Sequence, residues 1–367
     1  MADERITPVV MPKWGLSMEE GKLTGWLVED GKRINVGEAI LEVETDKIAG
    51  SVEASVPGTL RRRVGEPGTI YPVKALLGVI ADESVPEKEI DDYVSSYVTP
   101  AAEEGEEGEA APKYEFIDLP DGRLRYAKRG SGAETVILIH GFGGDLDNWL
   151  FNIDALAENA TVYALDLPGH GQSVKKVDNI SLPVLAMTVV SFMNALDVKA
   201  AHFVGHSLGG AIAMEIAREA PDRVKSLTLI STAGLGPEIN IDYINGFVNA
   251  SSRRDLKPVV EQLFANPSLV TRQLVDDLLK YKRLDGLTEA LRALAASVFP
   301  GGKQGARLAP GRVPTLVIWG KEDRIIPSTH AAAASGAKIE VIDGAGHMVQ
   351  MEQAGKVNAL IRAHIAA

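Results

Sequence analysis

Three residues in the second half of the chain have the types and the order needed to activate a serine hydroxyl. Ser207 lies in the pentapeptide GHSLG at 205–209, Asp323 follows an apolar run, and His347 follows the next such run. A neutral imidazole can take the serine proton while a carboxylate fixes the tautomer of the imidazole. Either Asp323 or His347 alone is most simply interpreted as a loop residue. The three together, in this order, predict nucleophilic catalysis by Ser207.

A glycine-rich segment, HGFGG at 140–144, follows the first long apolar run of the same half. Backbone N–H groups in such a turn can bind the oxyanion that forms when a serine attacks a carbonyl group. We expect the N–H of Phe142 to be one donor and the N–H of Leu208, directly after the nucleophile, to be the other. His170, in the turn DLPGHG at 166–171, is expected to be structural or to line the pocket.

Lys47, in the first half, has the position of a covalent attachment site. It lies in ETDKI at 44–48, between alternating stretches at 41–45 and 51–54 that predict a hairpin with the lysine at its tip. An exposed tip leaves the ammonium group accessible to a modifying enzyme. Because an Asp-Lys pair in a turn is by itself most simply a solvated turn, the assignment depends on the motifs that surround it.

The elements that must position Ser207, Asp323 and His347 can be read from apolar runs in the second half. Six such runs predict strands, at 135–139, 161–165, 201–204, 226–230, 315–319 and 339–342. They alternate with amphipathic segments, which indicates a mainly parallel sheet whose strands are buried on both faces. All three side chains would then follow strand ends, at the edge where catalytic loops gather.

The interval from about 237 to 312 interrupts this alternation. It contains helical stretches at 269–279 and 287–296 and no convincing strand, which predicts a helical cap over the sheet. The first half is different again, because short alternating stretches and Pro-Gly or Asp-Gly turns between 5 and 82 predict many short strands. The segment 86–97 predicts one short helix. We therefore expect domains at 1–84 and 113–367, joined over 85–112 by an acidic linker with that helix.

Composition excludes several classes of function. The chain has 367 residues, a formal net charge of -12 and no cysteine. The negative charge argues against nucleic acid as a partner, and the absence of thiols excludes disulfides, thiolate metal sites and a cysteine nucleophile. No metal site is predicted. The N-terminus lacks the order of a signal peptide and no apolar run is long enough to span a membrane, so we expect a cytoplasmic protein with no membrane partner.

The motifs of the two halves resemble two known families. The serine turn, the glycine-rich segment, the aspartate and the histidine resemble the α/β-hydrolase superfamily over 113–367. Around Lys47, the segments MPKWGLSMEEG, EDG, VGE and VPGT between 11 and 59 resemble lipoyl domains of 2-oxo-acid dehydrogenase complexes. Biotin carriers share that fold but favour methionine on both sides of the lysine, where this chain has Asp46 and Ile48.

These resemblances imply a fold class and a cofactor. The fold is an all-β flattened barrel of lipoyl/biotinyl type, followed by an α/β-hydrolase domain with a mainly parallel sheet, helices on both faces and a helical cap. The cofactor is lipoate, covalently bound to Lys47.

A lipoyl domain joined to an α/β-hydrolase domain resembles the acyltransferase component of bacterial acetoin dehydrogenase complexes. The resemblance implies transfer of an acetyl group from lipoyl-Lys47 to coenzyme A. It implies two partners, a thiamine-diphosphate-dependent component that cleaves acetoin and a dihydrolipoamide dehydrogenase. The chain departs from the usual acyltransferase domain of such complexes, because none of its seven histidines begins an HxxxDG motif. We therefore expect the transfer to pass through a Ser207 acyl-enzyme.

Two other interpretations stay open at this point. The second domain is an ester or thioester hydrolase that the lipoyl domain docks to a complex, or the chain is a non-catalytic lipoyl carrier and scaffold. The intact order of Ser207, Asp323 and His347 weighs against the second of these.

Overall fold

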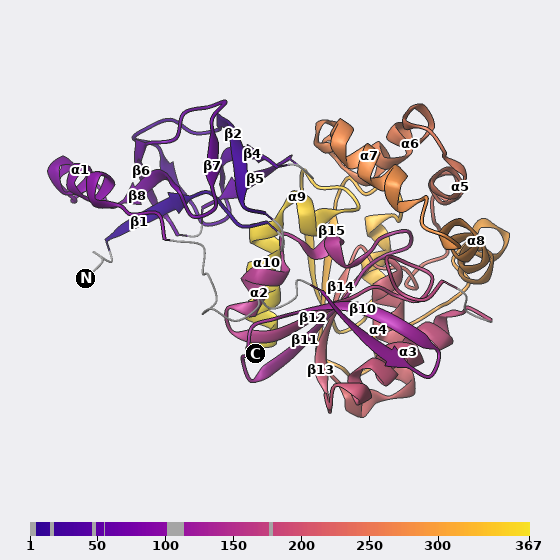
Figure 1. The fold of residues 1–367 in the computed structure, drawn as a ribbon. Helices are drawn as coiled ribbons and strands as arrows, with labels where there is room; N and C mark the ends of the chain where they lie inside the picture. Colours follow the sequence, from indigo (N-terminus) through magenta and orange to yellow (C-terminus); the bar gives the residue numbers. More distant parts are fainter. Residues whose placement is uncertain (1–4, 15–17, 46–48, 55, 101–113, 176–178) are drawn as a thin grey trace. The chain divides into compact units, whose positions relative to one another are not determined.

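The computed structural model of the chain describes residues 5–14, 18–45, 49–54, 56–100, 114–175 and 179–367. The chain divides into two compact units, Met1–Lys113 and Tyr114–Ala367, which are described separately below (Figure 1). The predicted linker residues 101–112 lie outside the described residues. Within the described ranges, no helix combines the length and the apolar character needed to cross a membrane.

The first unit is built from short antiparallel strands, as predicted. Two four-stranded sheets, in the orders β1-β8-β6-β3 and β5-β4-β2-β7, enclose an apolar core. Alternation places Leu23, Leu41 and Leu60 in that core, where each is fully buried. The strands are β1 (Ile6–Val10), β2 (Glu20–Trp26), β3 (Arg33–Ile34), β4 (Ala39–Glu44), β5 (Ala49–Glu53), β6 (Gly58–Arg63), β7 (Ile70–Pro72) and β8 (Leu76–Ala81).

Strands β4 and β5 form the hairpin predicted around the candidate attachment lysine. Their antiparallel register pairs Glu44 with Ala49, so the segment that contains Lys47 connects two paired strand ends. Lys47 itself lies outside the described residues. Because β4 and β5 bring both ends of the connecting segment together, these two strands fit an attachment site at the end of the hairpin.

Helix α1 (Glu87–Ser96) packs on the first unit. Its Ile90 is fully buried in an apolar cluster with Val79 of β8 and Ile6 of β1. The hydroxyl of Tyr97, just beyond the helix, donates a hydrogen bond of 2.9 Å to the carbonyl oxygen of Lys74. The ion pairs of this helix, such as Arg62 with Asp91 at 2.6 Å, are exposed and contribute little to stability. The apolar contact therefore holds α1 in place.

We expect an Ile90→Ala substitution to loosen α1 from the first unit. Removal of a fully buried isoleucine side chain costs about 2–5 kcal/mol, which here is a loss of local stability in the α1–β8 contact. Hydrogen exchange of the full chain, followed by mass spectrometry, should show faster exchange over 76–96 and unchanged exchange in the second unit. Lys88→Ala, at an exposed position of the same helix, is the control. Equal exchange in the two variants would contradict this role for Ile90.

The second unit contains one eight-stranded sheet, in the order β16-β15-β14-β13-β11-β12-β10-β9. The six strands from β11 to β16 run parallel to one another, whereas β10 pairs antiparallel with both β9 and β12. The strands are β9 (Glu115–Leu119), β10 (Gly122–Arg129), β11 (Glu134–Ile139), β12 (Ala160–Leu165), β13 (Ala201–His206), β14 (Val224–Ile230), β15 (Thr315–Gly320) and β16 (Lys338–Ile342).

Helices cover both faces of this sheet (Figure 1). Helices α3 and α4 pack together, α4 against β13 and β14, while α10 packs against α2 and against β14 and β15. The helices of the sheet layers are α2 (Ile153–Ala157), α3 (Leu182–Ala195), α4 (Leu208–Glu219), α9 (Val349–Glu352) and α10 (Ala354–Ile365). The mainly parallel sheet with helices on both faces confirms the predicted fold class.

The predicted helical cap is present between β14 and β15. It comprises α5 (Ile241–Asn249), α6 (Arg253–Val260), α7 (Arg272–Tyr281) and α8 (Leu287–Val298). Side chains cap the first three of these helices, since Asn240, Ser252 and Thr271 each accept a hydrogen bond from a backbone N–H in the first turn. The cap helices are thus inserted in the chain between the carboxyl end of β14 and the start of β15.

Two details of the sheet differ from the sequence-based prediction. The expectation that all six parallel strands are buried on both faces is wrong for β16, where Ile339 and Val341 are 41% and 46% exposed, because β16 is an edge strand with one neighbour. The hairpin of β9 and β10 was not predicted. Its strands carry charged residues on the exposed side, so they lack the continuous apolar runs of the central strands.

Candidate active site

Ser207 lies in a sharp turn between β13 and α4. Its backbone has φ 52° and ψ -116°, a conformation that is strained for a residue with a side chain and that aims the side chain away from strand and helix. The flanking glycines are required by close contacts, because a Cβ on Gly205 would lie 2.4 Å from the carbonyl oxygen of Gly209. A Cβ on Gly209 would lie 2.1 Å from the carbonyl oxygen of Ile139. The turn thus forms as the GHSLG sequence predicts.

The glycine-rich segment after β11 lies directly against this turn. A Cβ on Gly141 would be 3.0 Å from the Cβ of Ser207. Within the part of the chain that the structure describes, the N–H groups of Phe142 and Leu208 donate no hydrogen bond, although both residues are buried. Two unpaired donors beside a buried serine are suited to bind a developing oxyanion.

Asp323 and His347 form a buried hydrogen-bonded pair. The Nδ1 of His347 lies 2.8 Å from Oδ2 of Asp323, and their side chains are 3% and 0% exposed. The same carboxylate accepts hydrogen bonds from the indole N–H of Trp319 at 3.0 Å and from the N–H groups of Ile325 and Ile326. Because the carboxylate accepts the Nδ1 proton, the Nε2 lone pair of His347 is left free to act as a base.

The structure brings His347 close to the nucleophile turn without a hydrogen bond to Ser207. The ring of His206, the residue before Ser207, lies 4.7 Å from the ring of His347, centroid to centroid. Its Nε2 donates a hydrogen bond of 3.0 Å to the carbonyl oxygen of His347. Among the described residues, no hydrogen bond joins Ser207 Oγ to His347. Such contacts are often long in free enzymes and tighten when substrate binds.

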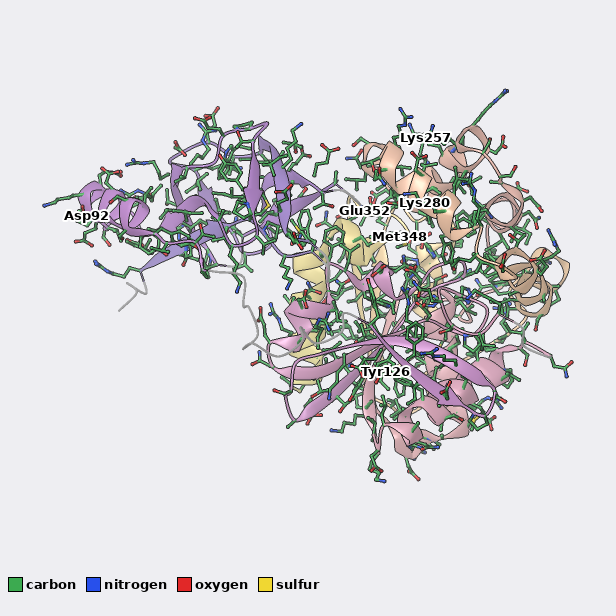
Figure 2. The ribbon with its side chains drawn as sticks, in the orientation of Figure 1. Asp92, Tyr126, Lys257, Lys280, Met348 and Glu352 are labelled. Atoms are coloured by element: carbon green, nitrogen blue, oxygen red, sulfur yellow. The ribbon has the colours of Figure 1, made fainter. Side chains whose placement is uncertain are left out.

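Two residues that position the site were not predicted from the sequence. His206 fixes the backbone of His347, and burial lowers its pKa well below the ordinary value, so it acts as a neutral donor. Glu352 of α9, labelled in Figure 2, accepts hydrogen bonds from the N–H of Gly346 at 2.6 Å and from that of Ala265 at 2.8 Å. These two bonds connect the His347 loop to the cap. The only local signal for His206 was its place directly before Ser207 in GHSLG, and nothing local marked Glu352.

His140 and His170, at the same edge, are structural. Burial lowers the pKa of His140 to about 4 and that of His170 to about 3, so both rings are neutral near pH 7. The Nε2 of His170 accepts a hydrogen bond of 3.2 Å from the N–H of Gly143, and that of His140 accepts one of 3.0 Å from Leu167. The two rings thus hold the glycine-rich segment, and the prediction that His170 is structural fits this arrangement.

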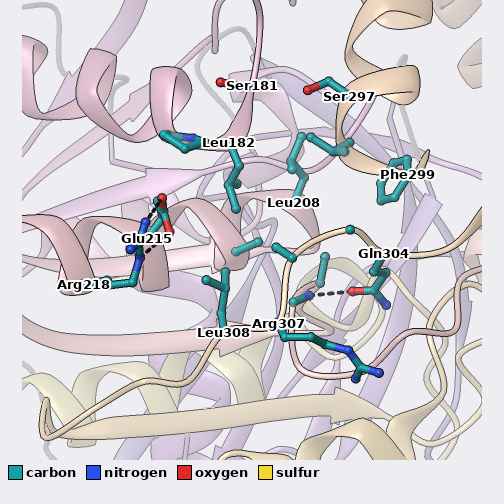
Figure 3. Close-up of a pocket in the computed structure, with 17 residues that line it drawn as sticks. Ser181, Leu182, Leu208, Glu215, Arg218, Ser297, Phe299, Gln304, Arg307 and Leu308 are labelled. Carbon is teal, nitrogen blue, oxygen red and sulfur yellow. Dashed lines mark hydrogen bonds and ion pairs between the residues drawn. The ribbon is translucent and has the colours of Figure 1, made fainter.

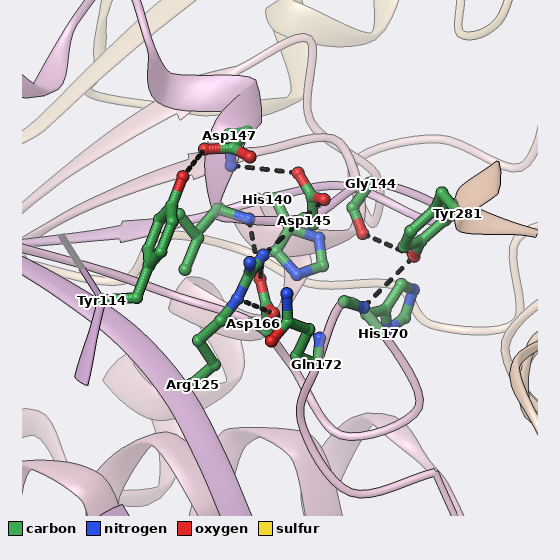
Figure 4. A network of polar contacts seen from close by, with 12 residues as sticks. Tyr114, Arg125, His140, Gly144, Asp145, Asp147, Asp166, His170, Gln172 and Tyr281 are labelled. Carbon is green, nitrogen blue, oxygen red and sulfur yellow. Dashed lines mark hydrogen bonds and ion pairs between the residues drawn. The ribbon is translucent and has the colours of Figure 1, made fainter. Parts of the chain in front are cut away.

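A buried ion pair supports the other side of that segment (Figure 4). Arg125 of β10 binds Asp166 through Nε at 2.6 Å and through a terminal nitrogen at 3.2 Å. Asp166 also accepts the N–H groups of Leu146 and Gln172, at 2.9 and 2.7 Å. The hydroxyl of Tyr281, from α7 of the cap, donates a hydrogen bond of 3.0 Å to the carbonyl oxygen of Gly144. The sheet and the cap therefore both fix the candidate oxyanion loop.

Asp145, inside this network, provides a prediction about pH. Burial, followed by the charges of Asp147 and Asp166, raises its pKa from 3.8 to about 7. Between these two pH values the folded chain therefore keeps a proton on Asp145 that the unfolded chain has released. The contribution of this proton to the free energy of unfolding falls as pH rises over that range and is lost above pH 7. Asp145→Asn removes that loss and keeps the side-chain oxygen that caps the N–H of Asp147. Relative to wild type, the variant should gain about 2 kcal/mol of unfolding free energy between pH 5.5 and pH 8.

Denaturant unfolding at the two pH values measures this difference. Asp121→Asn, in the exposed turn between β9 and β10, is the control, because it makes the same change in net charge. A gain for Asp145→Asn that is the same at both pH values would contradict a raised carboxyl pKa.

The described residues contain no group of three or more histidine or acidic side chains placed to hold a metal ion.

Comparison with known proteins agrees with this geometry. Residues 134–354 match the family model described as alpha/beta hydrolase fold, and residues 7–77 match the one described as biotin-requiring enzyme. A meta-cleavage product hydrolase from Pseudomonas fluorescens IP01 has a similar structure, with a TM-score of 0.62 and 25% identity over 69% of this chain and 97% of that chain.

Two relatives span both units. The dihydrolipoyllysine-residue acetyltransferase component of the acetoin cleaving system of Cupriavidus necator is 56% identical over 98% of this chain and 97% of its own length. The corresponding component from Pseudomonas putida is 47% identical over 98% of this chain and 100% of its own length. The chain therefore belongs, with its alpha/beta hydrolase fold, to the family of dihydrolipoyllysine-residue acetyltransferase components of acetoin cleaving systems.

Proposed function

We propose that this chain transfers an acetyl group from a lipoyl thioester to coenzyme A through an acyl-enzyme on Ser207. The observation that carries the proposal is the buried Asp323–His347 hydrogen bond of 2.8 Å, at the sheet edge where Ser207 occupies its strained turn. The unpaired N–H groups of Phe142 and Leu208 support it. The family relationship supports the choice of acetyl donor and acceptor.

Lipoate is proposed to be attached to Lys47, between β4 and β5, where it supplies the acetyl group as a thioester. In the first half of the reaction, His347 Nε2 takes the proton of Ser207 as the serine oxygen bonds to the thioester carbonyl carbon. The N–H groups of Phe142 and Leu208 bind the resulting oxyanion. The carbon–sulfur bond then breaks, and His347 returns the proton to the departing sulfur. Ser207 is left as an acetyl ester.

The second half reverses these roles. His347 takes the thiol proton of coenzyme A, whose sulfur attacks the acetyl carbonyl carbon, and the carbon–oxygen bond to Ser207 breaks. His347 then protonates the serine oxygen. Asp323 stabilises the imidazolium in both halves without taking its proton. The low exposure of Ser207 and His347, 7% and 2%, limits the access of bulk water to the acyl-enzyme.

The same proposal implies two partners. A thiamine-diphosphate-dependent component would cleave acetoin and load the acetyl group, and a dihydrolipoamide dehydrogenase would reoxidise the lipoyl group. Membership in the family of acetoin cleaving components supports both.

A partition experiment separates transfer from hydrolysis. The lipoylated chain is acetylated, and the release of acetate and of acetyl-coenzyme A is followed with and without coenzyme A. We expect coenzyme A to accelerate deacetylation at least about 100-fold, about 2.7 kcal/mol of barrier, with acetyl-coenzyme A as the main product. Release of acetate at an equal rate in both samples would instead support a hydrolase that the first unit docks to a complex.

A further inference from the structure

A cavity of the second unit lies along helix α4, which begins directly after Ser207 (Figure 3). Its volume is about 440 Å³, and its walls come from α4, from the start of α3, from residues 233–234 after β14, and from the end of α8 with the segment that follows it. On α4 it is lined by Leu208, Ala211, Glu215 and Arg218, and opposite them by Phe299 and Arg307. The α4 residues that line it span about three turns of the helix.

The inner end of the cavity adjoins the proposed oxyanion donors. Leu208 lines the cavity and directly follows Ser207. The ring of Phe299 also lines it and packs edge-to-face on the ring of Phe142, with centroids 5.9 Å apart. A ligand that fills the cavity would therefore end beside the residues that carry both donors.

The volume does not suit the acetyl group alone. A water molecule, which has one heavy atom, occupies about 30 Å³ in the liquid. An acetyl group has three heavy atoms and would therefore leave most of the cavity empty. From Leu208 to Arg218 the helix advances about 15 Å at 1.5 Å per residue. A pantetheine chain has about as many backbone atoms as four to five residues, which reach roughly 15 Å when extended. The cavity therefore matches a long, narrow thiol.

The two arginines differ in their partners. Arg218 binds Glu215 at 2.6 Å and Glu219 at 2.7 Å, so its charge is already compensated. Arg307, on the exposed rim, forms no hydrogen bond or ion pair with any described residue, although its charge contributes, after the hydrogen bond from His330, to the lowered pKa of Glu238. A guanidinium group whose hydrogen-bond donors are not used by described residues is suited to bind a phosphate in a bidentate manner.

We propose that this cavity binds the 4′-phosphopantetheine arm of the coenzyme A acceptor. The thiol lies at the Leu208 and Phe299 end, and Arg307 binds phosphate at the rim. This assignment rests on the proposed function for its choice of acceptor. The lipoyl arm is also long and narrow, but it carries no phosphate that would need Arg307.

Calorimetric titration of the full chain, without an acetyl donor, tests the assignment. Coenzyme A and pantetheine are titrated into wild type, Arg307→Gln and Arg312→Gln. We expect Arg307→Gln to weaken coenzyme A binding at least about tenfold, the loss of one charge-assisted hydrogen bond, and to leave pantetheine binding unchanged. Arg312 is an exposed arginine that does not line the cavity, so Arg312→Gln should bind both ligands like wild type.

A second variant tests the cavity itself. Ala306→Trp, at a half-buried lining position, should weaken both coenzyme A and pantetheine. If coenzyme A binds all variants equally, the cavity assignment fails while the proposed acetyl transfer stands. If the wild-type chain binds no coenzyme A at millimolar concentration, the proposed acceptor itself fails.

Discussion

A Ser207→Ala chain should lose acetyl transfer to coenzyme A by a factor of about 10³ or more. The substitution removes the only atom that can form the acyl-enzyme, and loss of a serine nucleophile costs at least this much in comparable sites. Fold and lipoylation should be unaffected, because alanine has the smaller side chain and Lys47 is in the other unit. Single-turnover transfer from the acetylated lipoyl group measures the loss.

Ser231→Ala is a matched control for this result. Ser231 follows β14 at the same sheet edge, has φ 42° and is fully buried. Within the described part of the chain its hydroxyl has no hydrogen-bond partner, so its removal should leave both activity and stability near wild type. Equal transfer by Ser207→Ala and wild type would mean that the thiol attacks the lipoyl thioester directly.

Asp323→Asn should lower kcat by about 10³- to 10⁴-fold with the fold intact. An asparagine oxygen can keep the hydrogen bonds from the N–H groups of Ile325 and Ile326. Its NH₂ group would then face the indole N–H of Trp319 and the Nδ1 of His347, which now bind a carboxylate oxygen. The imidazole is pushed toward the wrong tautomer, with its proton on Nε2, so it cannot take the serine proton.

Two measurements check that this loss arises in the site. Trp319 fluorescence should change in Asp323→Asn because the indole N–H loses one of its two acceptors and keeps only the carbonyl oxygen of Ile326, at 3.2 Å, whereas thermal unfolding should change little. Asp343→Asn, at an exposed carboxylate that binds Lys321, should keep both activity and fluorescence. A wild-type kcat in Asp323→Asn would mean that acetyl transfer does not need the Asp323 carboxylate.

The parts of the site that could be predicted from the sequence are those that local geometry decides. The turn at Ser207 needs glycines at fixed positions, so the pentapeptide reveals it. Asp323 and His347 follow the ends of β15 and β16, and parallel strands bring their carboxyl ends to one edge. Their pairing then follows from the topology rather than from any closeness in sequence.

The remaining parts depend on contacts that no local pattern encodes. His206 reaches the backbone of His347 across 141 positions of the chain, and Arg125 reaches Asp166 across 41. The cavity along α4 is lined by four separate segments, so its shape is set by tertiary packing alone. The β9–β10 hairpin was missed because one of its sides is exposed and charged.

Trapping of the acyl-enzyme tests whether Ser207 carries the acetyl group during transfer. The lipoylated chain is acetylated with isotopically labelled acetyl groups in the absence of coenzyme A, quenched in acid, digested and analysed by mass spectrometry. We expect a labelled acetyl ester on the peptide that contains Ser207. This label should disappear when coenzyme A is added before the quench. Full formation of acetyl-coenzyme A with no label on that peptide at any time would contradict it.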